Sequence, residues 1–393
     1  MISKRARAVN PAATLAMSRL AKEMQAEGVD VINLGVGESD FQTPQNVTDA
    51  AIAAIESHQT SFYTPTSGVK ELKQAIINQV AQRYQAEISL SNVTVTTGAK
   101  LSLYVLMQVL LDPGDIVVAS SPLWVSYVEQ IKLAGGVMQT IQPNNDELKL
   151  TISDLKQLST KIKVIIVNSP TNPTGQVYTR DELVAILNWA NKHDVYIILD
   201  EIYGQLVYNG AEFTSGLQIQ SLENSRMIIV DGVSKAYAMT GWRIGWTLAT
   251  SEIIATMNKL LDHMTSNPTA VAQYAAIAAL NGDQSTVELM RVAFEKRLNT
   301  TFDLLNTVPG LQVAKKPQGA FYLFPKVSPQ VLTKAGVADT TALSMKILQE
   351  AHVAMPSGEG FGMPGYLRMG YAKDQSVLNE AIRRLTAFFK QYN

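Results

Sequence analysis

The sequence predicts an α/β fold, with a mostly parallel sheet covered by helices on both faces and a smaller α+β region beside it. Between about residues 46 and 280, short apolar runs alternate with amphipathic helical segments. This alternation requires crossover connections, which make neighbouring strands parallel and place helices on both faces of the sheet. After about residue 286 the order of helices and strands becomes mixed, which indicates a separate region.

The first elements can be assigned from their periodicity. Residues 45–56 and 68–83 have the apolar spacing of amphipathic helices, whereas residues 93–96 and 116–119 are short buried strands. Gly98-Ala99-Lys100 forms the turn between the first of these strands and a helix that begins near residue 101. Its free backbone N–H groups and the positive end of the helix dipole could bind an anion.

The following elements end at polar turns. The apolar run 164–167 stops at the Asn-Ser-Pro-Thr-Asn-Pro-Thr-Gly sequence of residues 168–175. Thr179 and Glu182 have the spacing of a capping box, which predicts a helix that begins there and continues to about residue 193. Two further apolar runs, at 195–199 and 227–230, are predicted strands of the sheet. The region after about residue 286 is predicted to contain a helix at 287–307, the run 319–324, a helix at 341–350, a strand at 366–371 and a helix at 376–392.

Polar side chains follow three successive strands of the predicted sheet. Asn172 follows the first strand, Asp200 and Tyr203 the second, and Lys235 the third. Ligands of open α/β sheets bind at the carboxyl ends of the strands, so these side chains are expected to converge on one crevice.

The run from Val233 to Arg243, with an arginine eight residues after Lys235, resembles the pyridoxal-phosphate lysine motif of the class I/II aminotransferases of fold type I. Asn172, Asp200 and Tyr203 are similar in order and spacing to the cofactor-binding set of that family. The resemblance extends from about Arg7 to the C-terminus. It implies a large cofactor-binding domain over residues 46–285 and a small domain built from residues 1–45 and 286–393.

The resemblance implies roles around pyridoxal 5'-phosphate. Lys235 would form the Schiff base and serve as the catalytic general base and acid, and Asp200 would hold the proton on the pyridine nitrogen. Asn172 and Tyr203 would bond the phenolic oxygen, and Trp124 would stack on the ring. The residues expected at the phosphate are Arg243, Ala99, Lys100, Ser234 and, from the neighbouring subunit, Tyr63. Gly232 stands where many relatives have a phosphate-binding serine, so Ser234 is the substitute considered.

Substrate binding is expected at a second set of residues. By resemblance, Arg368 would grip the α-carboxylate, helped by Asn172 and the backbone at Gly37, while Trp124 covers the substrate. Lys100 lies at the start of a helix, where a cation opposes the helix dipole, so an anionic partner is expected for it. A distal substrate carboxylate would supply that anion. The resemblance to the bacterial aspartate aminotransferase subgroup adds Thr14 beside the same group.

The predicted function is therefore a ping-pong transfer of an amino group from an L-amino acid, with aspartate as donor and 2-oxoglutarate as acceptor. Aromatic or broad donor specificity is the alternative. Two rivals also use this fold: a carbon–sulfur β-lyase with the same cofactor residues, and a ligand-sensing module of a transcription regulator. The second is disfavoured, because too few residues precede the first motif to build a DNA-binding domain.

Composition narrows the range of partners. The net charge of −1 offers no basic field for nucleic acid or an anionic membrane, and the chain has no cysteine. No signal peptide or spanning segment is recognised, so we expect a soluble cytoplasmic protein. The family resemblance at Tyr63 implies a homodimer with shared active sites. The four histidines share no metal-ligand spacing with carboxylates, so no metal is expected. Residues 360–365 match a dinucleotide fingerprint, Gly-Phe-Gly-Met-Pro-Gly, but no helix is predicted after them, so no nucleotide site is expected there.

Overall fold

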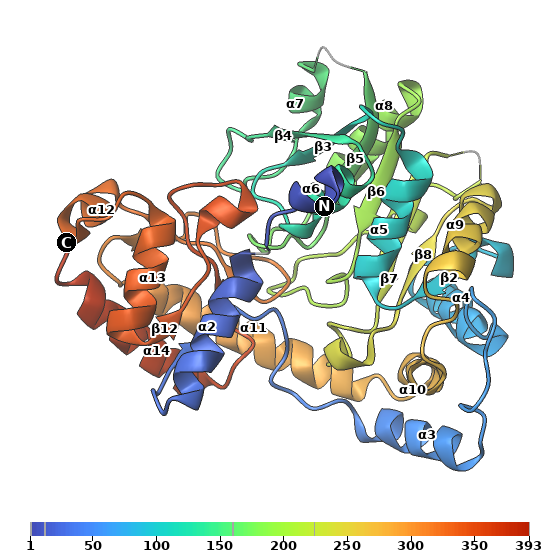
Figure 1. Ribbon diagram of the computed structural model, residues 1–393, viewed down its shortest axis with the longest axis horizontal. Helices are drawn as coiled ribbons and strands as arrows, with labels where there is room; N and C mark the ends of the chain where they lie inside the picture. Colours follow the sequence, from blue (N-terminus) through green and yellow to red (C-terminus); the bar gives the residue numbers. More distant parts are fainter. Residues whose placement is uncertain (1, 12, 159–160, 224, 393) are drawn as a thin grey trace.

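A seven-stranded sheet forms the centre of the fold (Figure 1). The structure, a computed structural model, describes residues 2–11, 13–158, 161–223 and 225–392. The strands of the sheet, in spatial order, are β2 (Val93–Thr96), β8 (Gly245–Leu248), β7 (Met227–Gly232), β6 (Tyr196–Asp200), β5 (Ile162–Asn168), β3 (Ile116–Ser120) and β4 (Val137–Ile141). Neighbouring strands from β7 to β4 are parallel, and β8 is antiparallel to both of its neighbours. The predicted mostly parallel sheet is confirmed.

Helices cover both faces of this sheet because alternate strand residues face opposite apolar layers. Ile165 and Val167 pack in one layer, whose helices are α3 (Gln45–Glu56), α4 (Lys70–Tyr84), α8 (Arg180–Lys192) and α10 (Ala270–Asn281). Val164 and Ile166 pack in the other, whose helices are α5 (Ala99–Leu110), α6 (Ser126–Leu133) and α9 (Ser251–Met264). Burial on both faces explains why the strands appear in the sequence as continuous apolar runs.

The second half of the molecule has its own apolar core. Its main helices are α11 (Ser285–Leu305), α13 (Thr340–Ala351) and α14 (Gln375–Phe389). Short strands pair around them: β1 (Ile32–Asn33) with β12 (Val353–Ala354), β10 (Tyr322–Leu323) with β13 (Met369–Gly370), and β11 (Lys326–Val327) with β9 (Leu311–Gln312). The remaining helices are α1 (Lys4–Arg7), α2 (Ala13–Ala26), α7 (Ile152–Lys156) and α12 (Pro329–Ala335).

Strand β1 comes from the N-terminal segment, and its partner β12 lies near the C-terminus. Helix α11 runs from the neighbourhood of the sheet to this second core (Figure 1). Both observations support a small domain made of residues 1–45 and 286–393 beside a large one of residues 46–285, and we retain this division as a proposal.

Local signals in the sequence located most elements to within a few residues. The capping box forms as predicted, since the Glu182 N–H donates to Thr179 Oγ1 at 3.3 Å and the Thr179 N–H donates to Glu182 Oε2 at 2.7 Å. The strand expected at 366–371 is shorter than predicted. On one side its backbone stays beside residues 321–325, since the Leu367 N–H donates to Pro325. On the other side the acceptor changes, because the Arg368 N–H donates to Pro356 and the Gly370 N–H donates to Leu34, and only β13 forms a ladder.

Candidate active site

The carboxyl ends of β5 and β6 are bonded together and carry polar side chains into one cavity. Asn168 Nδ2 and the Ser169 N–H both donate to the carbonyl oxygen of Asp200, at 2.9 and 3.1 Å. This places the turn that carries Asn172 beside Asp200, as the predicted strand ends require. The cavity has a volume of about 440 Å³.

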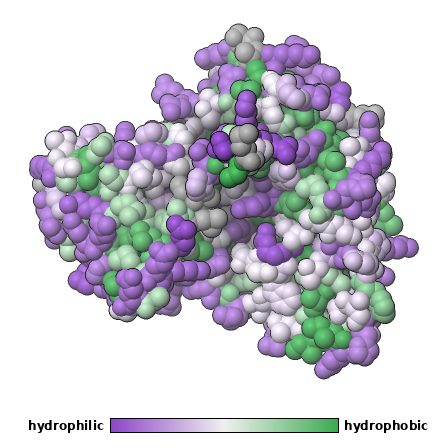
Figure 2. Space-filling model, in the orientation of Figure 1, coloured by the Kyte–Doolittle hydropathy of each residue, from purple (hydrophilic) through white to green (hydrophobic). Residues whose placement is uncertain are grey.

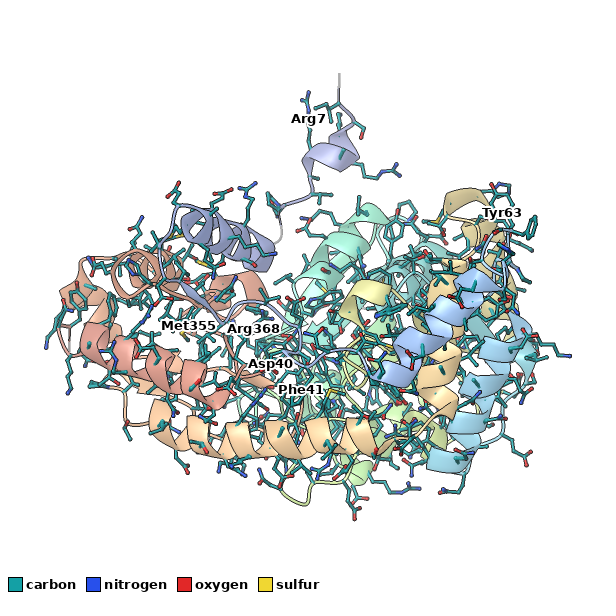
Figure 3. The ribbon with its side chains drawn as sticks, turned by 90° about the horizontal axis from the view of Figure 1, so that it is seen from below. Arg7, Asp40, Phe41, Tyr63, Met355 and Arg368 are labelled. Carbon is teal, nitrogen blue, oxygen red and sulfur yellow. The ribbon has the colours of Figure 1, made fainter. Side chains whose placement is uncertain are left out.

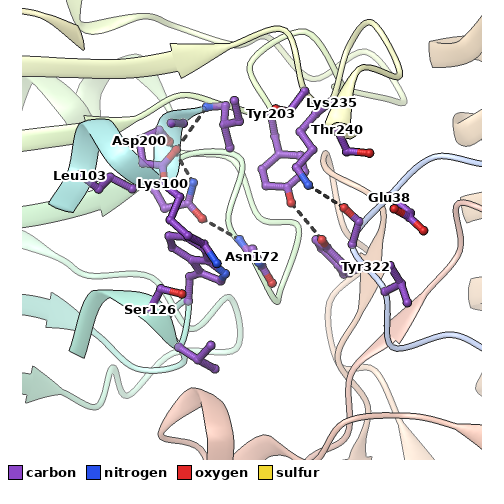
Figure 4. A pocket seen from close by; sticks show the side chains of 18 of the residues that line it. Glu38, Lys100, Leu103, Ser126, Asn172, Asp200, Tyr203, Lys235, Thr240 and Tyr322 are labelled. Atoms are coloured by element: carbon purple, nitrogen blue, oxygen red, sulfur yellow. Dashed lines mark hydrogen bonds between the residues drawn. The ribbon is translucent and has the colours of Figure 1, made fainter. Parts of the chain in front are cut away.

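Eleven of the thirteen predicted site residues line this cavity, and Figure 4 shows several of them with their hydrogen bonds. They are Gly37, Ala99, Lys100, Trp124, Asn172, Asp200, Tyr203, Ser234, Lys235, Arg243 and Arg368. Residues that are more than 300 positions apart in the chain therefore meet here.

Asp200 is a buried carboxylate, with 5% of its surface exposed. The hydroxyl of Tyr127 donates to Asp200 Oδ2 at 2.5 Å, and the Ile202 N–H donates to Oδ1 at 3.3 Å. Desolvation nevertheless raises the pKa of Asp200 above its usual value. A protonated ring nitrogen beside this carboxylate would favour its ionised form, so the site suits a cationic heterocycle.

Lys235 places an amine in the cavity beside Gly37. Its Nζ donates to the Gly37 carbonyl at 2.6 Å. Burial, together with the positive charges of Arg368 and Arg243, lowers the pKa of Lys235 to about 8. Near neutral pH a useful fraction of this amine is therefore unprotonated, as a nucleophile or a general base must be.

Gly37 leaves room for an aromatic hydroxyl. A Cβ at Gly37 would lie 2.3 Å from the hydroxyl oxygen of Tyr322. That hydroxyl and the hydroxyl of Tyr203 are 2.9 Å apart and share a hydrogen bond. The two tyrosines are both buried, so the wall of the cavity beside Lys235 is built from a pair of bonded phenols.

Trp124 and Lys100 form the opposite side of the cavity. Lys100 Nζ lies 5.1 Å from the centroid of the Trp124 ring, and this ring packs edge-on against Tyr127 with centroids 5.3 Å apart. Desolvation, and then the charge of Arg243, lower the pKa of Lys100. Within the described part of the chain, no carboxylate forms an ion pair with this lysine.

An anion-binding corner lies where α5 begins. Gly98 precedes the helix with a φ of +80°, and a Cβ there would lie 2.3 Å from Arg243 Nη2. A Cβ at Gly245 would lie 2.2 Å from the Ala99 nitrogen. Backbone N–H groups at a helix start, with a guanidinium beside them, fit a phosphate group.

Position 232 cannot supply the phosphate-binding serine of many relatives. A Cβ at Gly232 would lie 2.8 Å from the Ile244 carbonyl oxygen, because β8 passes directly beside it. Ser234 lines the cavity with 6% of its surface exposed, as required of the substitute considered for that serine.

Arg368 is a buried cation with 3% of its surface exposed. Its Nη1 donates to Asn172 Oδ1 at 3.0 Å and its Nη2 donates to the Gly35 carbonyl at 2.6 Å. Its Nε is buried and has no hydrogen-bond partner. An unpaired buried donor on a guanidinium that lines a cavity is suited to a carboxylate ligand.

The other two predicted site residues are Tyr63 and Thr14. Tyr63 is 91% exposed and lies far from Arg368 (Figure 3), so within its own chain it contributes nothing to the cavity. The side chain of Thr14 lies outside the described residues. Tyr127 and Tyr322 were not predicted from the sequence as site residues. Their roles depend on partners 73 and 119 positions away, and no local pattern signals such contacts.

Other kinds of site are not found in the described part of the chain. It contains no helix that is long and apolar enough to cross a membrane. It also contains no group of three or more histidine, cysteine or acidic residues arranged to hold a metal ion. No helix follows the glycine-rich segment 360–365, as expected.

Comparisons with known proteins agree with this geometry. Residues 29–385 match the family described as aminotransferase class I and II. The chain is 47% identical to an aspartate aminotransferase of Bacillus sp. (strain YM-2) and 45% identical to an asparagine–oxo-acid transaminase of Streptococcus mutans, with 99% of each chain covered. The solved structure of an aspartate aminotransferase from Thermotoga maritima superposes with a TM-score of 0.90 at 35% identity, covering 99% of this chain and 100% of that one.

Proposed function

This chain belongs to the class I and II aminotransferases, and we propose that it transfers the amino group of aspartate to 2-oxoglutarate in a ping-pong cycle that uses pyridoxal 5'-phosphate. The observation that carries the proposal is the position of Lys235. An amine with a pKa of about 8 shares one cavity with a buried carboxylate, Asp200, and a buried guanidinium, Arg368.

The residues of the cavity fit the cofactor. Pyridoxal phosphate supplies an electron-withdrawing ring that stabilises negative charge at the substrate α-carbon. Asp200 would hold the proton of the ring nitrogen, and Asn172 with Tyr203 would bind the phenolic oxygen. Trp124 would cover the ring. The phosphate would be bound by the backbone of Ala99 and Lys100 and by the side chains of Ser234 and Arg243.

Lys235 has two tasks in this proposal. Its unprotonated amine would hold the cofactor covalently, and the free amine would carry the proton that leaves the substrate α-carbon. The Gly37 carbonyl, 2.6 Å from Nζ, orients the free amine over the cavity. Arg368 holds the substrate carboxylate through its fork and its unpaired Nε.

Lys100 supports aspartate as the donor. This partly buried cation lies beside Arg243 and pairs with no carboxylate in the described ranges. Because desolvation and the charge of Arg243 disfavour the charged form of this lysine, an anion beside it would stabilise that form, and the distal carboxylate of a dicarboxylic substrate is such an anion. The relatives that carry the name aspartate aminotransferase point the same way.

Aromatic donors are the second candidate. Trp124 and Leu103 line the cavity on the same side as Lys100, so an apolar side chain would also find contact there. A structure similar to this chain, at 34% identity and a TM-score of 0.85, is that of an aromatic aminotransferase from Pyrococcus horikoshii.

We also propose a cytoplasmic homodimer in which Tyr63 reaches the cofactor phosphate of the neighbouring subunit. Phe62 and Tyr63 are 77% and 91% exposed, and Ile52 and Ile55 of α3 are about half exposed. Figure 2 shows apolar surface in the region of α3, at its lower right. Apolar surface of this kind is typical of an interface between subunits. The absence of cysteine supports a reducing compartment.

The test is a reconstitution with the purified protein. Wild type should take up pyridoxal phosphate, absorb in the near-ultraviolet to violet and bleach with borohydride, and it should form glutamate from aspartate and 2-oxoglutarate. Lys235→Ala should abolish turnover, whereas Lys192→Ala, at an exposed lysine of α8, should not. A colourless wild type would refute the proposal. Pyruvate formed from cystathionine, without amino transfer, would indicate the β-lyase.

A further inference from the structure

We propose that Tyr322 and Phe361, the aromatic pair, are positioning residues for Arg368, and that the Tyr322 hydroxyl couples this arginine to Tyr203. The proposal deepens the proposed function and rests on it, because it takes Arg368 as the residue that binds the substrate carboxylate. Neither aromatic residue was expected at the site from the sequence.

The guanidinium is surrounded by groups that leave its positive charge unneutralised. Its Cζ lies 4.5 Å from the ring centroid of Tyr322 and 4.9 Å from that of Phe361. Its two hydrogen-bond acceptors, an amide oxygen of Asn172 and the carbonyl of Gly35, are both neutral. No carboxylate forms an ion pair with it in the described part of the chain.

This arrangement solves a problem that every buried carboxylate-binding arginine has. Burial disfavours the charged guanidinium and lowers the pKa of Arg368. An acidic partner would stabilise the charge, but it would also compete with the substrate for the same donors. The faces of aromatic rings attract a cation without accepting its hydrogen bonds. The aromatic pair therefore stabilises Arg368 and keeps its donors available.

The glycine-rich segment places the Phe361 ring. The Phe361 carbonyl accepts from the Leu123 N–H at 3.0 Å, so the segment is fixed to the loop that carries Trp124. Gly362 has a φ of +74° and a Cβ there would lie 3.0 Å from Ser121 Oγ; at Gly358 a Cβ would lie 2.1 Å from the Met363 carbonyl oxygen. Gly362 of the fingerprint-like segment and Gly358 just before that segment thus permit the tight turn that carries Phe361.

Tyr322 makes a second connection. Its ring packs on Arg368, and its hydroxyl lies 2.9 Å from the Tyr203 hydroxyl. One side chain therefore touches both the proposed carboxylate ligand and the proposed ligand of the cofactor's phenolic oxygen. Loss of the Tyr322 hydroxyl should weaken the hydrogen bond that Tyr203 donates to the cofactor, since hydrogen bonds in a chain polarise one another.

Carboxylate binding to the holoenzyme tests the role of the rings. Phe361→Leu and Tyr322→Leu remove one ring each, and Tyr322→Phe keeps the ring and removes only the hydroxyl. The probes are succinate and 3-phenylpropanoate, which share one carboxylate with the substrates, and binding is measured by calorimetry. Each leucine variant should raise both dissociation constants about tenfold, in the range expected for a desolvated cation–π contact. Tyr322→Phe should change them less than about twofold.

The coupling between Tyr322 and Tyr203 is tested separately, by measuring the absorbance of the bound cofactor as a function of pH. The midpoint should move upward in Tyr322→Phe and remain at the wild-type value in Phe361→Leu. In Phe361→Leu, steady-state kinetics should show a higher KM for both aspartate and phenylalanine and a smaller change in kcat. A merely structural role would lower cofactor content and kcat together.

The binding measurements test the positioning role of the two rings, and the pH titration tests the coupling of Tyr322 to Tyr203. The positioning role is wrong if both leucine variants bind the two probes as wild type does, or if Tyr322→Phe loses as much affinity as Tyr322→Leu. If one leucine variant fails to fold, the other decides. The coupling is wrong if the titration midpoint of Tyr322→Phe equals that of wild type. A wild type that takes up no pyridoxal phosphate refutes the proposed function instead, so the two failures are distinguishable.

Discussion

Replacing Lys100 by serine should lower the specificity constant for aspartate and leave that for phenylalanine almost unchanged. The substitution removes the cation over Trp124 and keeps the backbone N–H group at the start of α5. Serine is small and uncharged, and it is tolerated in the first turn of a helix. The change therefore isolates the side chain of Lys100 from the phosphate contact proposed for its backbone.

The magnitude follows from the charge and the partial burial of Lys100. Two unit charges about 4 Å apart interact by ~4 kcal/mol at the effective dielectric constant of ~20 that applies near a protein surface. Solvent screens part of this interaction, and charge-assisted hydrogen bonds contribute ~1.5–3 kcal/mol. The ratio of specificity constants for aspartate and phenylalanine should therefore fall by about 10- to 100-fold.

The assay compares kcat/KM for the two donors, with 2-oxoglutarate as acceptor, in wild type, Lys100→Ser and Lys192→Ser. The last variant removes a charge at the end of α8 and should keep the wild-type ratio. A ratio unchanged by Lys100→Ser would remove Lys100 from substrate recognition. An equal loss for both donors would show that the lysine acts on a group common to both reactions, such as the cofactor phosphate.

Three further outcomes are expected. The pKa of Lys235 is lowered to about 8, and only the neutral amine attacks a carbonyl. The rate at which cofactor-free protein captures pyridoxal phosphate, measured by stopped flow, should therefore rise with pH up to about 8 and then level off. A rate that still rises at pH 10 would assign the reaction to another amine. Tyr127→Phe removes the 2.5 Å hydrogen bond to Asp200 and should raise the dissociation constant of the cofactor about tenfold in equilibrium dialysis, and unchanged retention would contradict the role of this bond. Tyr63→Phe should weaken cofactor retention without altering subunit association, and sedimentation of a catalytically active monomer would rule out a shared site.

Local chemistry in the sequence was enough to predict the residues at the strand ends. Asn172, Asp200 and Lys235 each follow an apolar run, and parallel strands carry such residues to one edge of the sheet. The capping box at Thr179 was equally predictable, because both of its partners lie within four residues.

Other parts of the site could not be predicted in this way. The Tyr322 run was recognised only as an apolar segment, because periodicity can indicate that a tyrosine is buried but cannot identify Tyr203 or Arg368 as its neighbours. The segment around Arg368 was predicted as one strand. Its backbone stays beside residues 321–325 on one side, but on the other side its partner changes from Pro356 to Leu34, and hydropathy does not report a change of partner.

Two glycines with crowded surroundings, Gly37 and Gly245, predict a particular pattern of genetic suppression. At Gly37 the atom that a new methyl group would strike is the terminal oxygen of Tyr322, 2.3 Å away. An inactive Gly37→Ala allele should therefore have an intragenic suppressor, Tyr322→Phe, which removes that oxygen. At Gly245 the obstacle is the backbone nitrogen of Ala99, 2.2 Å away, which no substitution can remove. Loss-of-function alleles at Gly245 should thus yield only true revertants in a selection that readily recovers second-site partners for Gly37.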